Sequence, residues 1–239
     1  TVDYILVPVG GGGLCTGVST LAKLLNPKIK VIAVEPAGAA CLKASLEAGE
    51  VTTVSKINTI ADGTAVQTPG DKLFPYLQAN VDHVITVDDS ELTLSFLDMA
   101  ENHKMIVENS GLLTVAALKH LDFKGKKVVS VLSGGNMDVL TMATVVQNGL
   151  MQRDRIFTVS VMLPDKPGQL AAVSSLIAKE QGNVIKLEHN VFANVNRTAG
   201  VELTITLESF GTEHKDQIIK ALEAAGYCPV ITKTNGIYM

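Results

Sequence analysis

The stretch Tyr4-Ile5-Leu6-Val7-Pro8-Val9-Gly10-Gly11-Gly12-Gly13-Leu14 joins an apolar run to four consecutive glycines. Tyr4–Val7 predicts a short buried strand, and Leu14–Leu25 has apolar residues at helical spacing until Asn26-Pro27. Because the glycines carry no Cβ, their backbone N–H groups can converge on an anion at the positive end of the following helix. The stretch therefore predicts an α/β fold with a phosphate-binding loop.

A dinucleotide-binding fingerprint is the nearest alternative for this loop. Glu35 ends the next predicted strand about 20 residues further on, where such folds place a ribose-binding acid. The pattern G-x-G-x-x-G, however, requires glycine at Cys15 if it starts at Gly10, and at Thr16 if it starts at Gly11. The glycine register therefore favours a monophosphate over a dinucleotide.

The composition is that of a globular protein that handles small metabolites. The 239 residues are 46% hydrophobic and 18% charged, which allows one large domain or two small ones. The net charge is −4 without a basic block, which disfavours nucleic acid and anionic membranes as partners. Three cysteines without a C-x-x-C pattern, and five histidines without metal-ligand spacing, disfavour disulfides and zinc, so we expect a cytoplasmic protein.

The first part of the chain alternates predicted strands and helices, which is typical of a parallel sheet covered on both faces. The strands are expected at Tyr4–Val7, Val31–Val34, Val84–Val87 and Val128–Leu132. The helices that follow the first are expected at Gly38–Ala48, Glu91–His103 and Gly111–His120. Asp88-Asp89-Ser90 stands before one of them as a helix cap.

A second domain is expected after the polar stretch Gln152-Arg153-Asp154-Arg155. We place the boundary so that residues 1–151 form one domain and residues 155–239 the other. The second domain has the order βαββαβ, a ferredoxin-like arrangement. Its elements are predicted at Ile156–Met162, Gly168–Lys179, Val184–Phe192, Val201–Leu207, Glu213–Ala225 and Pro229–Thr232.

A second glycine turn, Ser133-Gly134-Gly135-Asn136, follows the last predicted strand of the first domain. Ser133 would lie just past the carboxyl end of that strand, where ligands collect in open α/β sheets. A plain turn is the alternative, with Asn136 capping a helix that begins near Met137.

Two further turns, Ile60-Ala61-Asp62-Gly63 and Val107-Glu108-Asn109-Ser110-Gly111, complete a set with the two glycine turns. Together with Val34-Glu35-Pro36 at a strand end, this set resembles pyridoxal-phosphate enzymes of fold type II, the tryptophan synthase β-like class. More narrowly, the chain resembles the carboxyl-terminal part of threonine dehydratases, which are related to serine racemases.

This resemblance implies a set of cofactor-binding residues. Gly10, Gly11, Gly12, Gly13 and Leu14 would hold the phosphate of pyridoxal 5'-phosphate, Gly63 would approach the cofactor, and Ser133 would face the pyridine nitrogen. A hydroxyl there leaves the nitrogen largely neutral, and such a weaker electron sink suits β-elimination. Glu108 would lie near the ring, or would act as an acid at the start of a helix.

The resemblance also implies a lysine that carries the cofactor as a Schiff base in a Ser-x-Lys-x-Arg setting. Nothing in residues 1–239 matches this pattern, and Lys56 follows Ser55 without the surrounding residues. The chain begins at Thr1 inside a predicted strand, so we expect a piece of a longer enzyme that is inactive alone. An incomplete sheet would expose an apolar edge or retain a missing amino-terminal fragment as a partner.

Some enzymes of this family bind a divalent cation. The resemblance implies Glu35, the carbonyl of Ala39 and an aspartate at the position of Cys41. A thiol is a poor ligand for Mg²⁺ or Ca²⁺, so we expect no metal here.

The second domain carries the turn Leu163-Pro164-Asp165-Lys166-Pro167-Gly168-Gln169-Leu170, followed later by Gly182-Asn183-Val184. Proline and glycine are frequent in ordinary loops before helices. In this order, however, the two segments resemble an ACT domain, an amino-acid-sensing module. The resemblance implies an effector site, often formed across a pair of such domains, at Asp165, Gly168, Gln169, Leu170, Asn183 and Val184.

The resemblance implies a dehydratase that acts on L-threonine or L-serine. With L-threonine the products are 2-oxobutanoate and ammonia. Isoleucine or valine could act as effector, and paired ACT sheets imply at least a dimer. Two alternatives stay open: a serine racemase or other β-eliminating enzyme, and a non-catalytic amino-acid-binding regulatory fragment.

Overall fold

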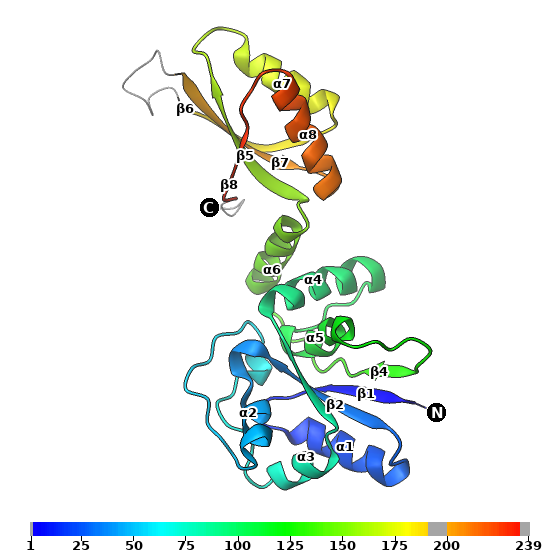
Figure 1. Cartoon of the computed structure of the whole chain (residues 1–239). Helices are drawn as coiled ribbons and strands as arrows, with labels where there is room; N and C mark the ends of the chain where they lie inside the picture. Colours follow the sequence, from blue (N-terminus) through cyan, green and yellow to red (C-terminus); the bar gives the residue numbers. More distant parts are fainter. Residues whose placement is uncertain (1, 191–199, 235–239) are drawn as a thin grey trace. The chain divides into compact units, whose positions relative to one another are not determined.

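The computed structural model describes residues 2–190 and 200–234, and it divides into two compact units, Thr1–Val146 and Gln147–Met239 (Figure 1). Each unit contains one four-stranded sheet. Within the described ranges, no helix is both long enough and apolar enough to cross a membrane.

The sheet of the first unit is parallel throughout, with the strand order β3-β2-β1-β4. Leu6 lies beside Ile32 on one side and Ser130 on the other. The carboxyl ends of the strands therefore meet at one edge of the sheet, and the glycine loop begins there. The strands span β1 Tyr4–Pro8, β2 Lys30–Pro36, β3 His83–Val87 and β4 Val128–Ser130.

Helices cover both faces of this sheet, as the sequence predicts (Figure 1). Leu6 and Ile32 point into a core with α4 (Asp89–Asp98) and α5 (Asn109–Ala116). The alternate residues Val7, Val31 and Ala33 point into a core with the helices of the opposite face. These helices are α1 Gly13–Leu25, α2 Cys41–Ala48 and α3 Phe74–Asn80.

The predicted helix Gly38–Ala48 is wrong in its first turn. A 3₁₀ turn spans Ala37–Ala39, and α2 begins only at Cys41. The backbone of Asn58 packs directly on Gly38, and the Asn58 N–H donates to the Gly38 carbonyl over 3.1 Å. This contact with a distant segment interrupts a helix that local spacing would continue.

Other helix ends also differ from the prediction. The helix expected to reach His103 leaves regular α-geometry after Asp98 and continues as a π-helical turn over Met99–His103. The next one begins at Asn109 and tightens into a 3₁₀ turn over Ala117–His120. The short helix α3 was not predicted. The cap at Asp88 is confirmed, because it forms a reciprocal capping box with Glu91.

The segment after β4 corrects two expectations. The strand ends at Ser130 rather than Leu132, although the Val131 N–H still donates to Leu6. The next helix, α6, spans Val139–Gln152 and is capped by Asp138, whose Oδ1 accepts the N–H groups of Leu140 and Thr141. Asn136 is therefore not the cap, because the helix begins at Val139 rather than near Met137. The Asn136 N–H donates to the Glu108 carboxylate.

The second unit has the predicted βαββαβ order and a sheet, β6-β7-β5-β8, in which every ladder is antiparallel. Helices α7 and α8 cover one face, where Val173, Ile177, Ile218 and Leu222 pack on β5 and β7. The predicted strand end at Phe192 lies outside the described residues. The elements span β5 Ile156–Leu163, α7 Gln169–Lys179, β6 Asn183–Asn190, β7 Val201–Glu208, α8 Thr212–Ala224 and β8 Val230–Thr232.

Candidate functional site

The loop between β1 and α1 requires glycine at two positions for packing and backbone reasons. Gly12 has φ +96°, and a Cβ there would lie 2.7 Å from Leu77 Cδ1. A Cβ on Gly10 would lie 2.9 Å from the Cα of Thr64. The loop is thus fixed between α3 and the Ala61–Thr64 turn, and its shape depends on the absence of side chains.

The other two glycines of the loop face open space. A Cβ on Gly11 or Gly13 would meet nothing within 4 Å. Within the described part of the chain, the backbone N–H groups of Gly10 to Gly12 donate no hydrogen bond. Free N–H groups at a helix start, with no side chain over them, form a site for an anion such as phosphate.

A cavity of about 190 Å³ adjoins this loop and gathers residues that are far apart in the sequence. Every cofactor-binding residue that the sequence predicts lies on its wall. Thr64, Glu108, Ser110 and Pro8 complete it, of which Thr64, Ser110 and Pro8 were not predicted. The full lining is Pro8, Gly10, Gly11, Gly12, Gly13, Leu14, Gly63, Thr64, Glu108, Ser110 and Ser133.

Close backbone approaches shape the walls of this cavity. A Cβ on Gly63 would lie 3.0 Å from Ser110 Oγ, and a Cβ on Gly111 would lie 2.8 Å from the Ser133 carbonyl oxygen. The Thr64 hydroxyl donates to the Ala61 carbonyl, which holds the turn before it. The two turns that flank the cavity are therefore packed directly against α5.

Glu108 directs its carboxylate at the cavity rather than at the start of α5. It stands at the N-cap position, but its side chain makes no capping hydrogen bond. Its Oε2 accepts the Asn136 N–H at 3.2 Å, and a Cβ on Gly134 would lie 2.5 Å from the carboxyl carbon. Gly134 has φ +93°, so glycine serves both the backbone and this close approach. The geometry favours a role beside a ligand over a role as a helix-start acid.

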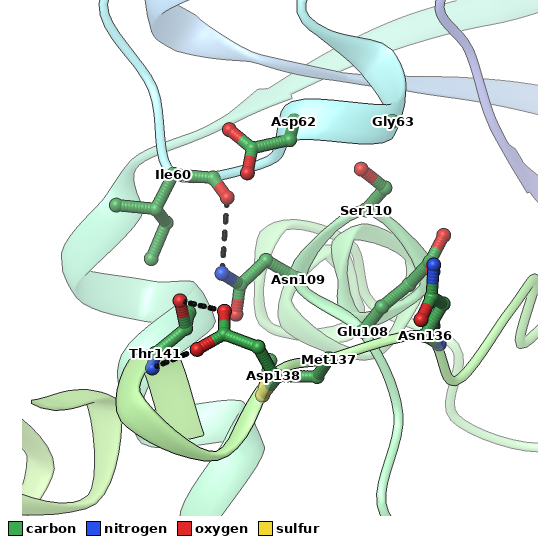
Figure 2. Close-up of a pocket in the computed structure, with 10 residues that line it drawn as sticks. All are labelled: Ile60, Asp62, Gly63, Glu108, Asn109, Ser110, Asn136, Met137, Asp138 and Thr141. Atoms are coloured by element: carbon green, nitrogen blue, oxygen red, sulfur yellow. Dashed lines mark hydrogen bonds between the residues drawn. The ribbon is translucent and has the colours of Figure 1, made fainter. Parts of the chain in front are cut away.

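A second cavity of about 290 Å³ adjoins the first and shares Gly63, Glu108 and Ser110 with it (Figure 2). The Ile60 segment on its rim is held by Asp89, which accepts the Thr59 hydroxyl at 2.6 Å and the Ile60 N–H at 3.0 Å. Asn109 Nδ2 donates to the Ile60 carbonyl at 2.9 Å. The remaining lining residues are Asp62, Asn136, Met137, Asp138 and Thr141. No lysine lines either cavity in the part of the chain that the structure describes.

The residues implied for a divalent cation do not fit one. Glu35 is fully buried, and its two oxygens accept the N–H groups of Leu42 (2.7 Å) and Lys43 (2.9 Å) at the start of α2. Cys41 contributes a thiol rather than an oxygen, and in the described ranges no three His, Cys, Asp or Glu side chains could hold a metal ion. Glu35 acts here as a helix cap, and Ala39 is part of the preceding 3₁₀ turn.

Burial raises the pKa of Glu35 from 4.5 to about 7. The folded chain therefore keeps a proton that the unfolded chain releases between pH 4.5 and 7, so this group lowers the unfolding free energy as pH rises through that window. We expect a loss on the order of 3 kcal/mol from this group alone. Urea unfolding at about pH 5 and about pH 7.5 measures it. Glu35→Gln should remove most of this pH dependence, and an unchanged dependence in that variant would contradict the assignment.

Burial also affects two of the three cysteines. It raises the pKa of Cys15 and of Cys41 to about 12, with the nearby Glu35 carboxyl contributing in the same direction. Both thiols are buried, whereas Cys228 is exposed. All three are free.

The predicted effector residues fall at opposite ends of the second sheet. Asp165, Gly168, Gln169 and Leu170 follow the end of β5 at Leu163, whereas Asn183 and Val184 begin β6. Asn183 pairs with Glu208, which pairs in turn with Ile156 at the start of β5. One chain therefore does not bring the two groups together. The Asn183 side chain also donates to Glu208 Oε2 at 3.1 Å.

A parallel sheet with a tetraglycine loop at its carboxyl edge, and a serine turn on the same cavity, defines a class of enzymes. The family profile described as pyridoxal-phosphate dependent enzyme matches residues 1–134, and the ACT domain profile matches residues 157–226. The chain therefore belongs to the pyridoxal-phosphate dependent enzymes.

Within that family, two relatives have the same activity in their names. An L-threonine ammonia-lyase of Geobacter sulfurreducens is 37% identical, over 97% of this chain and 58% of its own length. One of Thermotoga maritima is 36% identical, over 95% of this chain and 57% of its own length. The chain thus spans somewhat more than half the length of these relatives.

Part of the chain also resembles solved structures, among them a threonine deaminase and a serine racemase. The processed form of threonine deaminase isoform 2 from Solanum lycopersicum has a TM-score of 0.57 and 31% identity, over 62% of this chain and 44% of its own. A serine racemase from Dictyostelium discoideum has a TM-score of 0.54 and 41% identity, over 58% of this chain and 45% of its own. These similarities agree with the fold class predicted from the sequence.

Proposed function

We propose that the chain is the carboxyl-terminal part of a threonine (serine) dehydratase that uses pyridoxal phosphate to convert L-threonine to 2-oxobutanoate and ammonia. The observation that carries the proposal is the single cavity lined by Gly10–Gly13, Leu14, Gly63 and Ser133. The names of the relatives support the substrate. In this proposal residues 1–151 belong to the catalytic domain, and residues 155–239 form a regulatory ACT domain.

The proposal assigns a role to each group of residues that line the cavity. When bound, pyridoxal phosphate supplies an electron sink for the elimination. The N–H groups of Gly10–Gly13 bind its phosphate with help from the positive end of α1. The Ser133 hydroxyl would face the ring nitrogen without giving it a full positive charge, and Gly63 lets its turn pack closely against Ser110 beside the cavity. The amine that moves the α-proton comes from a lysine outside residues 1–239.

The activity is tested on the full-length protein with L-threonine and L-serine, by measuring 2-oxo acid and ammonia. We expect both products, with L-threonine as a substrate. Treatment with pyridoxal phosphate and borohydride, followed by intact mass measurement of every polypeptide, locates the lysine. An adduct on a lysine within residues 1–239 would overturn the assignment of that lysine to another segment.

A serine racemase is the alternative that a specific observation favours, because the D. discoideum racemase is 41% identical over 58% of this chain. The ACT match over residues 157–226 favours the dehydratase, since it provides for amino-acid control. Formation of D-serine from L-serine without ammonia release would decide for the racemase.

We also propose that the ACT domain binds an amino-acid effector, and that two copies of the chain form each site. The two groups of predicted effector residues lie at opposite ends of β5, so the Asp165–Leu170 turn of one copy would meet Asn183 and Val184 of another. Calorimetric titration with isoleucine and with valine tests this. We expect saturable heat with one of the two amino acids, at one site per chain in a dimer. The absence of heat with both would contradict the sensor role and also the alternative of a non-catalytic regulatory fragment.

A further inference from the structure

The second cavity has an acidic lining and no basic one. Asp62, Glu108 and Asp138 contribute three carboxylates, and none of the ten lining residues is Lys, Arg or His. The Asp62 carboxylate and Glu108 Oε1 receive no hydrogen bond within the described part of the chain. The lining therefore favours a ligand that brings positive charge, hydrogen-bond donors, or both.

A buried acceptor without a partner points to the same kind of ligand. Asn109 is 6% exposed, and among the described residues its Oδ1 has no hydrogen-bond partner. The orientation of the amide is fixed, because Nδ2 donates to the Ile60 carbonyl at 2.9 Å. Figure 2 shows the Asn109 side chain between the Asp62 carboxylate and the Asp138 carboxylate. A buried acceptor left unpaired carries the full cost of its desolvation, so a donor that reaches it is stabilised there.

The ligand is better matched by an ammonium group than by a metal ion or an amino acid zwitterion. In the described ranges no three acidic, histidine or cysteine side chains stand close enough to coordinate a metal. N–H···O contacts of about 2.8 Å tolerate wider spacing than metal–oxygen bonds of about 2.0–2.6 Å. An α-carboxylate would find no counter-charge among the lining residues. The volume of about 290 Å³ holds a small amine with ordered water.

We propose that this cavity is a binding site for an ammonium group with N–H donors, either the ammonium ion or a small primary alkylammonium, next to the cofactor cavity. Asn109 Oδ1 accepts one N–H, and Asp62 and Glu108 provide the negative charge. Asp138 adds charge but is already engaged, since it accepts both the N–H and the hydroxyl of Thr141. Identifying the occupant with the ammonia released in catalysis rests on the proposed function, whereas the binding itself does not.

The test is an NMR titration of the ¹⁵N-labelled chain with methylammonium chloride. We expect saturable shifts of the Asn109 side-chain amide and of the Asp62 backbone amide. Tetramethylammonium has the same charge without N–H donors, and potassium is a bare ion, so neither should reproduce the shifts. An equal response to either cation, or no saturation with methylammonium, would overturn the proposal.

Substitution of a lining residue tests whether methylammonium binds in this cavity. Asp62→Asn should weaken methylammonium binding by about tenfold, because a charged acceptor is lost. Asp122→Asn is the matched control, because Asp122 is exposed like Asp62 but lies outside the cavity, where it accepts the backbone N–H of Lys124. Equal affinity of the two variants would reject the site.

Two further titrations distinguish the sources of the ammonium group. Ammonium chloride and L-threonine are titrated separately, and we expect saturation by ammonium. Saturation by L-threonine alone would contradict the predicted exclusion of a carboxylate. Binding of pyridoxal phosphate at the glycine loop is measured independently, so failure of this site leaves the proposed function intact.

Discussion

Gly11→Val is expected to lower the affinity of the chain for pyridoxal phosphate by about 100-fold or more while leaving its stability unchanged. The new side chain meets no protein atom within 4 Å at Cβ, and it projects beside the N–H groups that we assign to the phosphate. Losing two hydrogen bonds to a charged group, at about 1.5 kcal/mol each, corresponds to this factor. Calorimetric titration with pyridoxal phosphate measures the affinity, and urea unfolding measures the stability.

Gly17→Ala is the control for this variant. Gly17 is also open, with nothing within 4 Å of its Cβ position, but it lies further along α1 and does not line the cavity. We expect unchanged affinity and a gain of up to about 1 kcal/mol in unfolding free energy from the better helix former. If Gly11→Val bound pyridoxal phosphate as tightly as Gly17→Ala, the glycine loop would not be the phosphate site.

Gly38→Ala is expected to reduce the unfolding free energy of the first unit by about 3 kcal/mol or more. The added Cβ would lie 1.8 Å from the carbonyl oxygen of Asn58, which is backbone and cannot rotate away. Relief of this overlap must displace the Asn58 segment, which leads to Asp62 and Gly63 at the cavities. We therefore also expect weaker binding of pyridoxal phosphate in the fraction that folds. Urea unfolding followed by circular dichroism measures the first effect, and titration measures the second.

The matched control for Gly38 is Gly49→Ala. Gly49 has φ +77° with nothing within 4 Å of its Cβ position. Alanine there carries only the cost of a left-handed backbone, about 1–2 kcal/mol. If Gly38→Ala lowered the unfolding free energy no more than Gly49→Ala, the Asn58 segment would be able to move away at little cost. The segment would then not depend on glycine at position 38.

The sequence predicted which turns lie together better than it predicted the ends of the elements. Gly10–Gly13 and Ser133 sit in turns that follow strands, and parallel strands bring their carboxyl ends to one edge, so local motifs were sufficient to place them together. The 3₁₀ turn over Ala37–Ala39 was not predictable in this way, because it depends on Asn58, which is distant in the sequence and close only after folding. Propensity and spacing do not carry such tertiary contacts.

The residues that the sequence missed have the same explanation. Thr64, Ser110 and Asn109 lie beside recognised positions, Gly63 and Glu108, but nothing local distinguishes a lining residue from a neighbour that faces away. The unpaired oxygen of Asn109 could only be recognised once its surroundings were known.

The cap of α6 follows from where the helix begins. Asp138 is the cap because α6 begins at Val139 rather than near Met137, and the Asn136 N–H donates instead to Glu108, in a turn 28 residues away in sequence. Both residues are good helix caps by type, so composition alone could not choose between them.

The unequal exposure of the cysteines makes the chain suitable for single-site chemical labelling. Cys15 and Cys41 are buried, and their thiols stay protonated at neutral pH because the pKa of each is about 12. Thiol-directed dyes react with the thiolate, so Cys228 alone should take up a maleimide in the native state. A fluorophore attached there would report on the second unit, since Cys228 lines neither cavity of the first. Association of donor-labelled and acceptor-labelled copies would be detected by energy transfer.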